Sequence, residues 1–450
     1  MKRPGRRRQG EALMPADGTA APRLWSPAAG DGRLDRRDLW RLALVGLLAL
    51  ALGLLGVETL EFYRHTEADR TLIGWEMLER GDFLVPHLLG SIILTKPPLF
   101  YWLMAAGIKL SGQATEGVAR LPSVLAGVLL ALVQYTAVRR AGGTRQVAVL
   151  FALVLSSGAA FLIDIQRAEI EMVFGFFSAA ALYSLYFSME ERSASLTVAG
   201  YLFLALAFLT KGPPILFFLL VTAAFFALWL RFRRRPESGR MTGGGRRLVA
   251  AHLMGAGMAL ALAGGWLLAL AHRVGWPALV EQVNVELVQR VVADSARGRG
   301  WLFYPWRFSG TLMPWTPFLL AGLALPFFQR RGWAPYRERA GAGWPFFIFN
   351  LTVVLSGFLV VSLSQGKSSR YLFPVYASAS MLAGFALLWL RGSRLLHRIL
   401  GMASLLALLA PLPLLAAAAT LSLEGVAHSR MILAAVLLSF ALVGFGLTLL

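Results

Sequence analysis

Apolar runs of about 20 residues recur along the chain, and they constrain its fold more than any other feature. A helix of about that length crosses the hydrocarbon core of a bilayer. Hydrophobic residues make up 57% of the 450 residues and charged residues only 15%, whereas soluble domains carry roughly 25% charged residues. The sequence therefore predicts an all-α, multi-pass transmembrane bundle with about 12 spans, at residues 39–57, 119–138, 146–163, 171–188, 196–210, 213–230, 248–271, 307–328, 344–363, 371–390, 395–419 and 431–450.

Basic residues between the runs predict the orientation of the chain in the cytoplasmic (inner) membrane. The net charge is +20, and arginines cluster in alternate connections, such as residues 139–145, 231–247 and 330–339. Because cytoplasmic connections are enriched in Lys and Arg, we expect these segments and the N-terminus in the cytoplasm. Nucleic acid is not an expected partner, since the basic residues lie in short segments between spans.

The predicted spans and their orientation divide the chain into two regions. Residues 1–38 are rich in Arg, Gly, Pro and Ala and lack an apolar core, which predicts a disordered basic cytoplasmic tail. Residues 39–450 form the predicted transmembrane domain, with a first outer loop at 58–118 and a second long outer loop at 273–306. The chain stops at Leu450 inside an apolar run, which leaves open a missing C-terminal region.

Residues 97–110 are apolar but are not expected to span the membrane. The stretch is short, begins with Pro97-Pro98 and carries Lys109, so an interfacial or re-entrant helix on the outer face suits it better. If it crossed the membrane, the arginines of residues 231–247 would lie outside, against the positive-inside rule.

Charged and aromatic motifs gather in the expected outer loops. Charges close to hydrocarbon are costly and mark a site when they converge, although single span-end charges usually only orient the helix. The chain has no cysteine, which excludes disulfides and thiolate chemistry. The motifs are Thr66-Glu67, Glu76-Met77-Leu78, Gly81-Asp82, Pro86, Lys96-Pro97-Pro98-Leu99, Tyr101-Trp102, Arg120-Leu121-Pro122-Ser123, Arg167-Ala168-Glu169-Ile170-Glu171-Met172, Leu209-Thr210-Lys211-Gly212-Pro213, Phe303-Tyr304, Met313-Pro314-Trp315, Ser364-Gln365-Gly366-Lys367 and Arg370-Tyr371-Leu372-Phe373-Pro374.

In order and approximate spacing, these motifs resemble those of the polyprenyl-phosphate-sugar-dependent membrane glycosyltransferases. That family includes lipid A aminoarabinose transferases and protein O-mannosyltransferases, and the resemblance covers the chain beyond its basic tail. It implies a GT-C-like fold and the transfer of a sugar from a polyprenyl-phosphate-linked donor to a lipid, glycan or protein acceptor on the outer face. In two places the chain departs from the pattern: the family's first-loop Asp aligns with Thr66, and its second-loop Asp aligns with Glu171.

The resemblance also implies roles for the matching residues. A carboxylate near the acceptor takes its proton or orients it, which makes Glu67 and Glu171 the expected catalytic residues. Cations placed where negative charge develops lower the barrier, so the expected ligands of the donor phosphate are Lys96, Arg290, Lys367 and Arg370. The expected contacts to the rest of the substrate are Tyr101, Tyr304, Tyr371, Asp69 and Lys211.

Several alternatives stay open at this point. No cofactor is certain, but a divalent ion could be held by Glu67 and Glu171 together with the donor phosphate, since hard cations favour oxygen ligands. A transporter or lipid flippase is a second hypothesis, although its charges would lie near span centres. A third is a catalytically lapsed relative that binds membrane lipid, for which Thr66 is the motivation.

Overall fold

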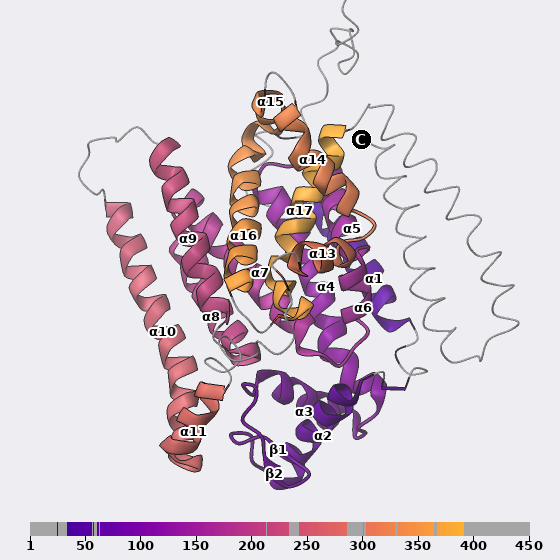
Figure 1. The fold of residues 1–450 in the computed structure, drawn as a ribbon, viewed down its shortest axis with the longest axis vertical. Coiled ribbons are helices and arrows are strands. Elements are labelled where there is room, and N and C mark those ends of the chain that lie inside the picture. Colours follow the sequence, from indigo (N-terminus) through magenta and orange to yellow (C-terminus); the bar gives the residue numbers. More distant parts are fainter. Residues whose placement is uncertain are drawn as a thin grey trace, which may run out of the picture.

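The computed structural model describes residues 25, 34–55, 57, 61–62, 64–212, 214–233, 243–285, 300, 303–328, 332–363 and 367–390. These residues are almost entirely helical (Figure 1). The helices are α1 (Arg36–Leu54), α2 (His65–Arg80), α3 (Leu99–Ser111), α4 (Glu116–Arg140), α5 (Arg145–Ser156), α6 (Ala159–Asp164), α7 (Ile170–Glu191), α8 (Ala194–Lys211), α9 (Pro214–Arg233), α10 (Gly243–Val274), α11 (Trp276–Val283), α13 (Phe303–Thr311), α14 (Thr316–Phe328), α15 (Ala334–Ala340), η4 (Gly341–Gly343), α16 (Trp344–Leu363), η5 (Ser369–Leu372) and α17 (Phe373–Leu390).

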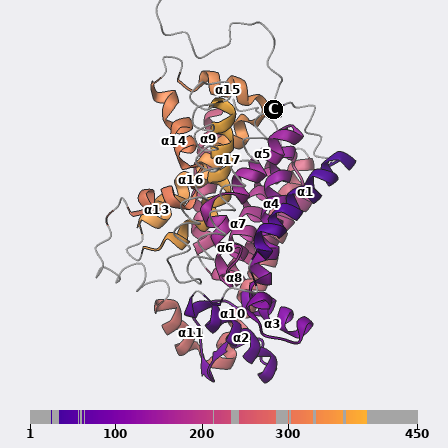
Figure 2. The ribbon, with the colours of Figure 1, turned by 90° about the vertical axis from the view of Figure 1, so that its right-hand side faces the viewer.

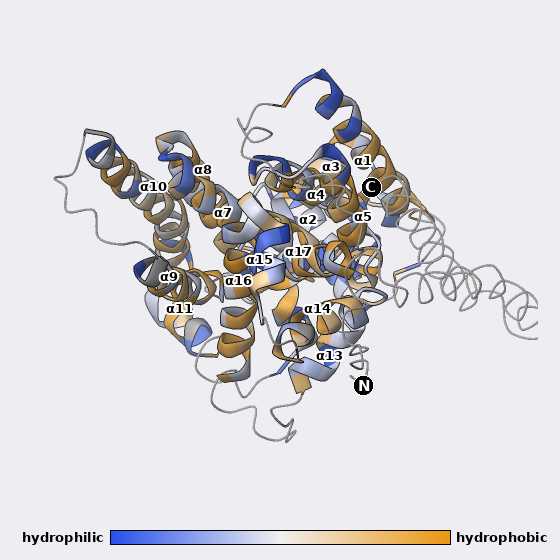
Figure 3. Ribbon diagram, turned by 90° about the horizontal axis from the view of Figure 1, so that it is seen from above, coloured by the Kyte–Doolittle hydropathy of each residue, from blue (hydrophilic) through white to orange (hydrophobic). Residues whose placement is uncertain are grey.

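Helices α4, α7, α16 and α17 form the middle of the bundle, and α8, α9 and α10 lie together at one side (Figures 1 and 2). The most apolar 18-residue stretch of α17 is completely buried, whereas only 11% of the corresponding stretch of α10 is buried. Figure 3 shows hydrophobic residues along the helices and hydrophilic ones mainly near helix ends. A helix that exposes side chains such as Leu253 and Leu260 must meet lipid, because water would make that surface costly.

The prediction of an all-α membrane bundle is confirmed. Six helices in the described part of the chain are long and apolar enough to cross a membrane: Glu116–Arg140, Ile170–Glu191, Ala194–Lys211, Gly245–Val274, Ala334–Leu363 and Arg370–Leu390. The predicted spans at 395–419 and 431–450 lie outside the described residues, so the number of 12 stays a prediction.

Two of the predicted spans are broken rather than continuous. Residues 146–163 form α5 and α6, with a break at Gly158, where an added Cβ would lie 2.0 Å from the Tyr376 hydroxyl. Residues 307–328 form parts of α13 and α14. The two breaks meet, since Ala159 N–H donates to the Met313 carbonyl at 2.8 Å and the Trp315 ring N–H donates to Ser157 Oγ at 2.8 Å. Backbone groups freed by a break must find partners inside protein, and here one backbone hydrogen bond and one side-chain hydrogen bond join the two breaks.

A small module, formed by α2, a β-hairpin and α3, lies at one end of the bundle (Figure 1). We call it the outer-loop module, because its residues belong to the predicted first outer loop. Its strands β1 (His87–Leu88) and β2 (Ser91–Ile92) pair antiparallel, a short hairpin that the sequence did not predict. The hairpin turn is held to α2, because the Glu76 carboxylate accepts from the backbone N–H groups of Leu89 and Gly90 at 2.6 and 3.2 Å. Helix α3 has 13 residues, about 20 Å, which is short of the roughly 30 Å hydrocarbon core.

A buried ion pair joins α1 to α4 near the opposite end of the bundle. Asp38 has no solvent exposure and accepts from Arg139 Nε at 2.8 Å and from the Tyr135 hydroxyl at 2.8 Å. Its other oxygen accepts from Arg139 Nη2 at 3.3 Å. Asp38 and Asp35 also form a capping box at the start of α1, so one carboxylate both begins the helix and fixes it to its neighbour.

Trp25 lies within the segment predicted to be a disordered tail, yet its side chain is buried against the bundle. Its ring stacks on Phe385 at 5.0 Å between centroids and meets Phe151 edge-on at 6.1 Å. The other residues of the tail, up to position 33, lie outside the described residues. The disorder of those residues therefore stays a prediction.

Candidate functional site

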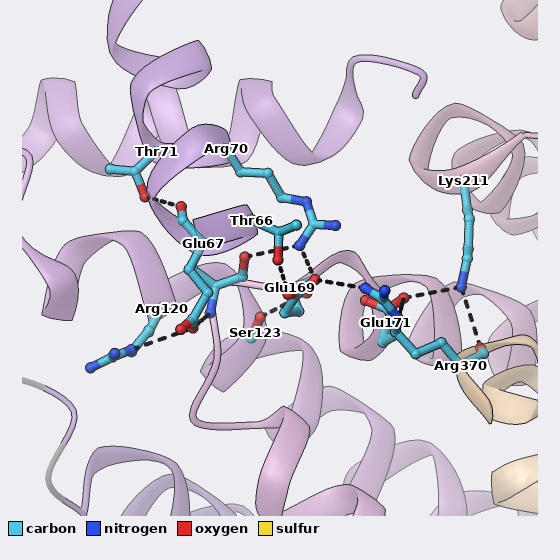
Figure 4. A network of polar contacts seen from close by, with 11 residues as sticks. Thr66, Glu67, Arg70, Thr71, Arg120, Ser123, Glu169, Glu171, Lys211 and Arg370 are labelled. Carbon is cyan, nitrogen blue, oxygen red and sulfur yellow. Dashed lines mark hydrogen bonds and ion pairs between the residues drawn. The ribbon is translucent and has the colours of Figure 1, made fainter. Parts of the chain in front are cut away.

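Charged side chains from five parts of the chain meet where the outer-loop module joins the bundle (Figure 4). We call this set the ionic network. Its three carboxylates are almost completely shielded from solvent: Glu67, Glu169 and Glu171 are 0%, 1% and 2% exposed. The full set is Thr66, Glu67 and Arg70 on α2, Arg120 on α4, Glu169 and Glu171 at the start of α7, Lys211 at the end of α8, and Arg370 on η5.

Glu169 is the centre of the ionic network. One of its carboxylate oxygens accepts from the Thr66 hydroxyl at 2.6 Å. The other forms an ion pair with Arg70 and lies 3.6 Å from Nη1 of Arg370. Its backbone carbonyl accepts from the Ser123 hydroxyl at 3.2 Å. Glu169 thus connects α2, α4 and η5 through one residue.

Glu67 lies on the side of the network that faces α4. Its Oε1 accepts from the backbone N–H of Ala168 at 2.7 Å and lies 3.8 Å from Arg120 Nε. The Arg120 guanidinium also donates to the backbone carbonyls of Val57 and Glu61 at 2.7 and 3.0 Å. Because these contacts hold both the carboxylate and its partner, Glu67 fixes the start of α2 against the loop before α7.

Glu171 lies on the side of the network that faces α8 and α17. Its Oε1 forms an ion pair with Lys211 Nζ at 3.2 Å and lies 4.0 Å from Arg370 Nε. Its Oε2 is buried and has no hydrogen-bond partner among the described residues. A buried acceptor without a partner is costly in a protein that binds nothing there. This oxygen can therefore accept a further hydrogen bond.

The ionic network carries more positive than negative charge. Four cations, Arg70, Arg120, Lys211 and Arg370, face three carboxylates, which leaves one positive charge in excess. Burial lowers the pKa of Arg70 from its ordinary value, although nearby carboxylates offset part of this effect. An anion entering the network would neutralise the excess, so the arrangement favours a ligand with a phosphate group.

The sequence of the chain is similar to that of known membrane transferases. Residues 95–244 match the model of the dolichyl-phosphate-mannose-protein mannosyltransferase family. An undecaprenyl phosphate-alpha-4-amino-4-deoxy-L-arabinose arabinosyl transferase of Edwardsiella ictaluri is 30% identical over 334 residues, which cover 72% of this chain and 54% of that protein. The enzyme of the same name from Pseudomonas aeruginosa (strain LESB58) is 30% identical over 381 residues, which cover 80% of this chain and 64% of that protein.

The fold is similar as well. The crystal structure of ArnT from Cupriavidus metallidurans bound to undecaprenyl phosphate matches with a TM-score of 0.69 at 21% identity, over 91% of this chain and 75% of that one. The chain has the fold of that structure and is similar in sequence to the two arabinosyl transferases. The resemblance that the motifs indicated is thereby confirmed. The matched regions span only 54% and 64% of the two curated relatives.

The structure places several of the expected site residues in the ionic network. Glu67 and Glu171 both belong to it, in separate ion pairs that Arg70 and Glu169 connect. Lys211, expected to contact substrate, is instead the direct partner of Glu171. The Tyr371 ring lies near this lysine, with 5.9 Å between Nζ and the ring centroid.

The other expected site residues are not members of the ionic network as defined above. Lys96 Nζ donates to the Thr95 carbonyl at 2.8 Å, and Lys367 Nζ donates to the Gly300 carbonyl at 3.3 Å. Tyr304 is buried, and its hydroxyl accepts from the Ser368 N–H at 3.3 Å. Tyr101 packs within the outer-loop module, Asp69 is partly exposed on α2, and Arg290 lies outside the described residues.

Sequence reasoning missed Arg70 and Glu169, which form the closest ion pair at the centre of the network. Arg70 follows Glu67 by three residues, and Glu169 precedes Glu171 by two within the motif of residues 167–172. The motifs gave neither residue a role. Their separation of 99 residues along the chain gives no local signal of contact.

Asp164, the last residue of α6, is a further acid near the network that sequence reasoning left without a role. Burial raises the pKa of Asp164 to about 7, and the charge of Glu171 adds to the rise, while Arg167, Arg64 and Lys211 oppose it. Its carboxyl therefore exchanges a proton near neutral pH, unlike an ordinary aspartate.

A divalent ion held by Glu67 and Glu171 together with the donor phosphate stays a prediction. Within the ranges that the structure describes, no group of three or more His, Cys, Asp or Glu residues is arranged to hold a metal ion. Glu67 Oε1 is engaged by Ala168 and Arg120, and Glu171 Oε1 by Lys211.

Proposed function

We propose that the protein is a membrane glycosyltransferase. It transfers a sugar from a polyprenyl-phosphate-linked donor to a lipid, glycan or protein acceptor at the outer face of the cytoplasmic membrane. The observation that carries the proposal is the buried ionic network, with one positive charge in excess and an unpartnered Glu171 oxygen beside Lys211 and Arg370. The class of donor is supported by the similar arabinosyl transferase, which is named for undecaprenyl phosphate, and by the structure of ArnT bound to undecaprenyl phosphate.

The residues of the network fit the charge changes of such a transfer. A bond forms between the acceptor oxygen or nitrogen and the anomeric carbon, while the bond from that carbon to the phosphate oxygen breaks. The electron pair stays on the phosphate, whose growing negative charge Arg370 and Lys211 stabilise. Arg370 is the better placed of the two, because its side chain is 41% exposed and can meet a ligand.

The acceptor loses a proton in this reaction, and a carboxylate within hydrogen-bond reach can take it. Glu171 Oε2 is the buried carboxylate oxygen with no partner among the described residues, so we assign it this role. Glu67 holds α2 in position through Ala168 and Arg120. Lys96, Arg290 and Lys367 remain proposed ligands of the donor phosphate on the strength of the motifs alone.

The proposal is favoured over a transporter by where the charges lie. The ionic network gathers at the ends of α4, α7, α8 and η5, at the junction with the outer-loop module. Transporters place coupling charges near the middle of discontinuous helices. A membrane enzyme needs its charges at the interface, where the donor phosphate lies.

Loss of the gene tests the proposed activity directly. A deletion strain should lose one sugar from an envelope lipid, glycan or protein and should accumulate the matching polyprenyl-phosphate sugar. Both changes are measured by mass spectrometry of lipid and glycan extracts. Wild-type protein supplied in trans should reverse both. Unchanged sugars together with an unchanged donor pool would contradict the proposed activity.

We also propose that the ionic network faces the outside and that the N-terminus is cytoplasmic. The arginine-rich connections, including Arg139 and Arg140, lie at the other ends of the helices that carry the network. Because the chain has no cysteine, single cysteines at the exposed residues Gln113 and Ser195 report sidedness. In intact cells, an impermeant maleimide should label the first and not the second, and the reverse pattern would invert the orientation.

A further inference from the structure

Position 66 is one of the two places where the chain departs from the pattern that its motifs resemble, because Thr66 stands where that pattern has aspartate. The structure shows what the threonine does. Its hydroxyl donates to Glu169 Oε1 at 2.6 Å, and the other oxygen of Glu169 pairs with Arg70. Thr66 has no carboxylate of its own, but the carboxylate of Glu169, at the start of α7, lies within hydrogen-bond distance of it.

The backbone of Glu169 directs this carboxylate toward α2. Glu169 is the N-cap residue of α7, but its side chain makes no capping hydrogen bond. Its carbonyl is fixed by the Ser123 hydroxyl on α4. N-cap carboxylates usually satisfy the first N–H groups of their own helix. Here the side chain is instead used for contacts with α2 and η5.

We propose that Glu169 is a positioning residue that supplies the carboxylate missing at position 66 and so holds Arg70 and Arg370 in place. The inference rests on the proposed function, and it concerns which residue aligns the two arginines. On this basis the threonine marks a relocated acid rather than a lapsed enzyme.

Helix geometry explains why one carboxylate can replace the other. Positions 66 and 70 are four residues apart on α2, so an aspartate at 66 would face Arg70 across one helical turn. An acid at 66 and an acid at 169 therefore serve the same guanidinium. Both acids together would lie within hydrogen-bond distance in a buried site, where two negative charges repel.

A double substitution tests the relocation. Glu169→Gln keeps the shape of the side chain but removes its charge, and it should lower kcat for transfer by roughly 10²-fold, the scale for misaligned catalytic groups. Thr66→Asp alone should also lower it. The combination T66D/E169Q restores one acid beside Arg70, and kcat should return to within about tenfold of wild type if the two positions act as one unit.

The matched control contains no acid at either position. T66V/E169Q keeps the shape of the wild-type threonine but carries neither its hydroxyl nor an acid, and it should stay as slow as E169Q. Recovery by T66V/E169Q, or no recovery by T66D/E169Q, would overturn the inference. A thermal midpoint in detergent is recorded for each variant, and recovery of the midpoint without recovery of kcat would also overturn it, since the role would then be structural.

Failure of the proposed function would look different. In that case the wild-type protein itself would transfer no sugar from polyprenyl-phosphate donors. The pairing of positions 66 and 169 would then be judged by thermal midpoints alone. Midpoints lowered by E169Q and restored by T66D/E169Q would support the relocated acid, and equal midpoints would reject it.

Discussion

Replacing Arg370 with methionine lowers glycosyl transfer by roughly 10²–10³-fold, the scale for losing one donor that stabilises charge in the transition state. The guanidinium lies 3.6 Å from Glu169 and 4.0 Å from Glu171, and its 41% exposure leaves it open to a phosphate. The fold should tolerate the change, because Glu169 keeps Arg70 and Glu171 keeps Lys211 as partners. Transfer is measured from a labelled polyprenyl-phosphate sugar to the acceptor found with the deletion strain.

Two further variants make this result specific. Arg370→Lys keeps the charge but loses the planar pair of donors that grips two phosphate oxygens, so its transfer rate should lie between wild type and R370M. Arg273→Met is the matched control, since Arg273 is also an exposed arginine paired with a carboxylate, Asp82 at 3.1 Å, away from the ionic network. If R273M and R370M lowered the transfer rate equally, Arg370 would have no specific role in the site.

Replacing Asp38 with alanine destabilises the protein by about 3–5 kcal/mol, the usual cost of leaving one partner of a buried ion pair alone. The change strands Arg139 and the Tyr135 hydroxyl, both of which donate to this carboxylate at 2.8 Å. It also removes one half of the capping box of α1. The thermal midpoint in a fixed detergent should fall by many degrees, while the transfer rate of the surviving protein stays near that of wild type.

The control for this prediction lies one residue further along α4. Arg140 pairs with Glu191 at 2.7 Å, but both side chains are partly exposed to solvent. Exposed ion pairs contribute about 0–1 kcal/mol, so Glu191→Gln should leave the midpoint almost unchanged. A D38A midpoint as high as that of E191Q would show that the buried pair does not hold α1 to the bundle.

The all-helical membrane fold could be predicted because its cause is local. Each span is a run of apolar residues whose length matches the bilayer, and helix starts are marked by single residues such as Thr115, Thr144 and Ser193, which cap α4, α5 and α8. The breaks at Gly158 and Met313 were not predicted. They leave the apolar pattern intact, and their backbone groups are satisfied by each other across the bundle.

Part of the candidate site could likewise be predicted from the sequence, and part could not. The motifs pointed to Glu67, Glu171, Lys211 and Arg370, and all four belong to the ionic network. They did not indicate that Lys211 faces Glu171, because a motif fixes residue types and order but not distances between helices. The charge runs also gave no sign that Asp164 titrates near neutral pH, since that property arises from burial.

The sequence by itself determined that the helices lie in a lipid bilayer, and it determined which kinds of residue are available for chemistry. The length of an apolar segment and the charges beside it decide whether and in which orientation that segment crosses the bilayer, independently of the other segments. The tertiary structure alone decided which charges meet. Thr66 and Glu169, 103 residues apart, share a hydrogen bond of 2.6 Å because α2 docks on the start of α7. A buried charge must find its partner wherever packing brings one, and packing is a property of the whole chain.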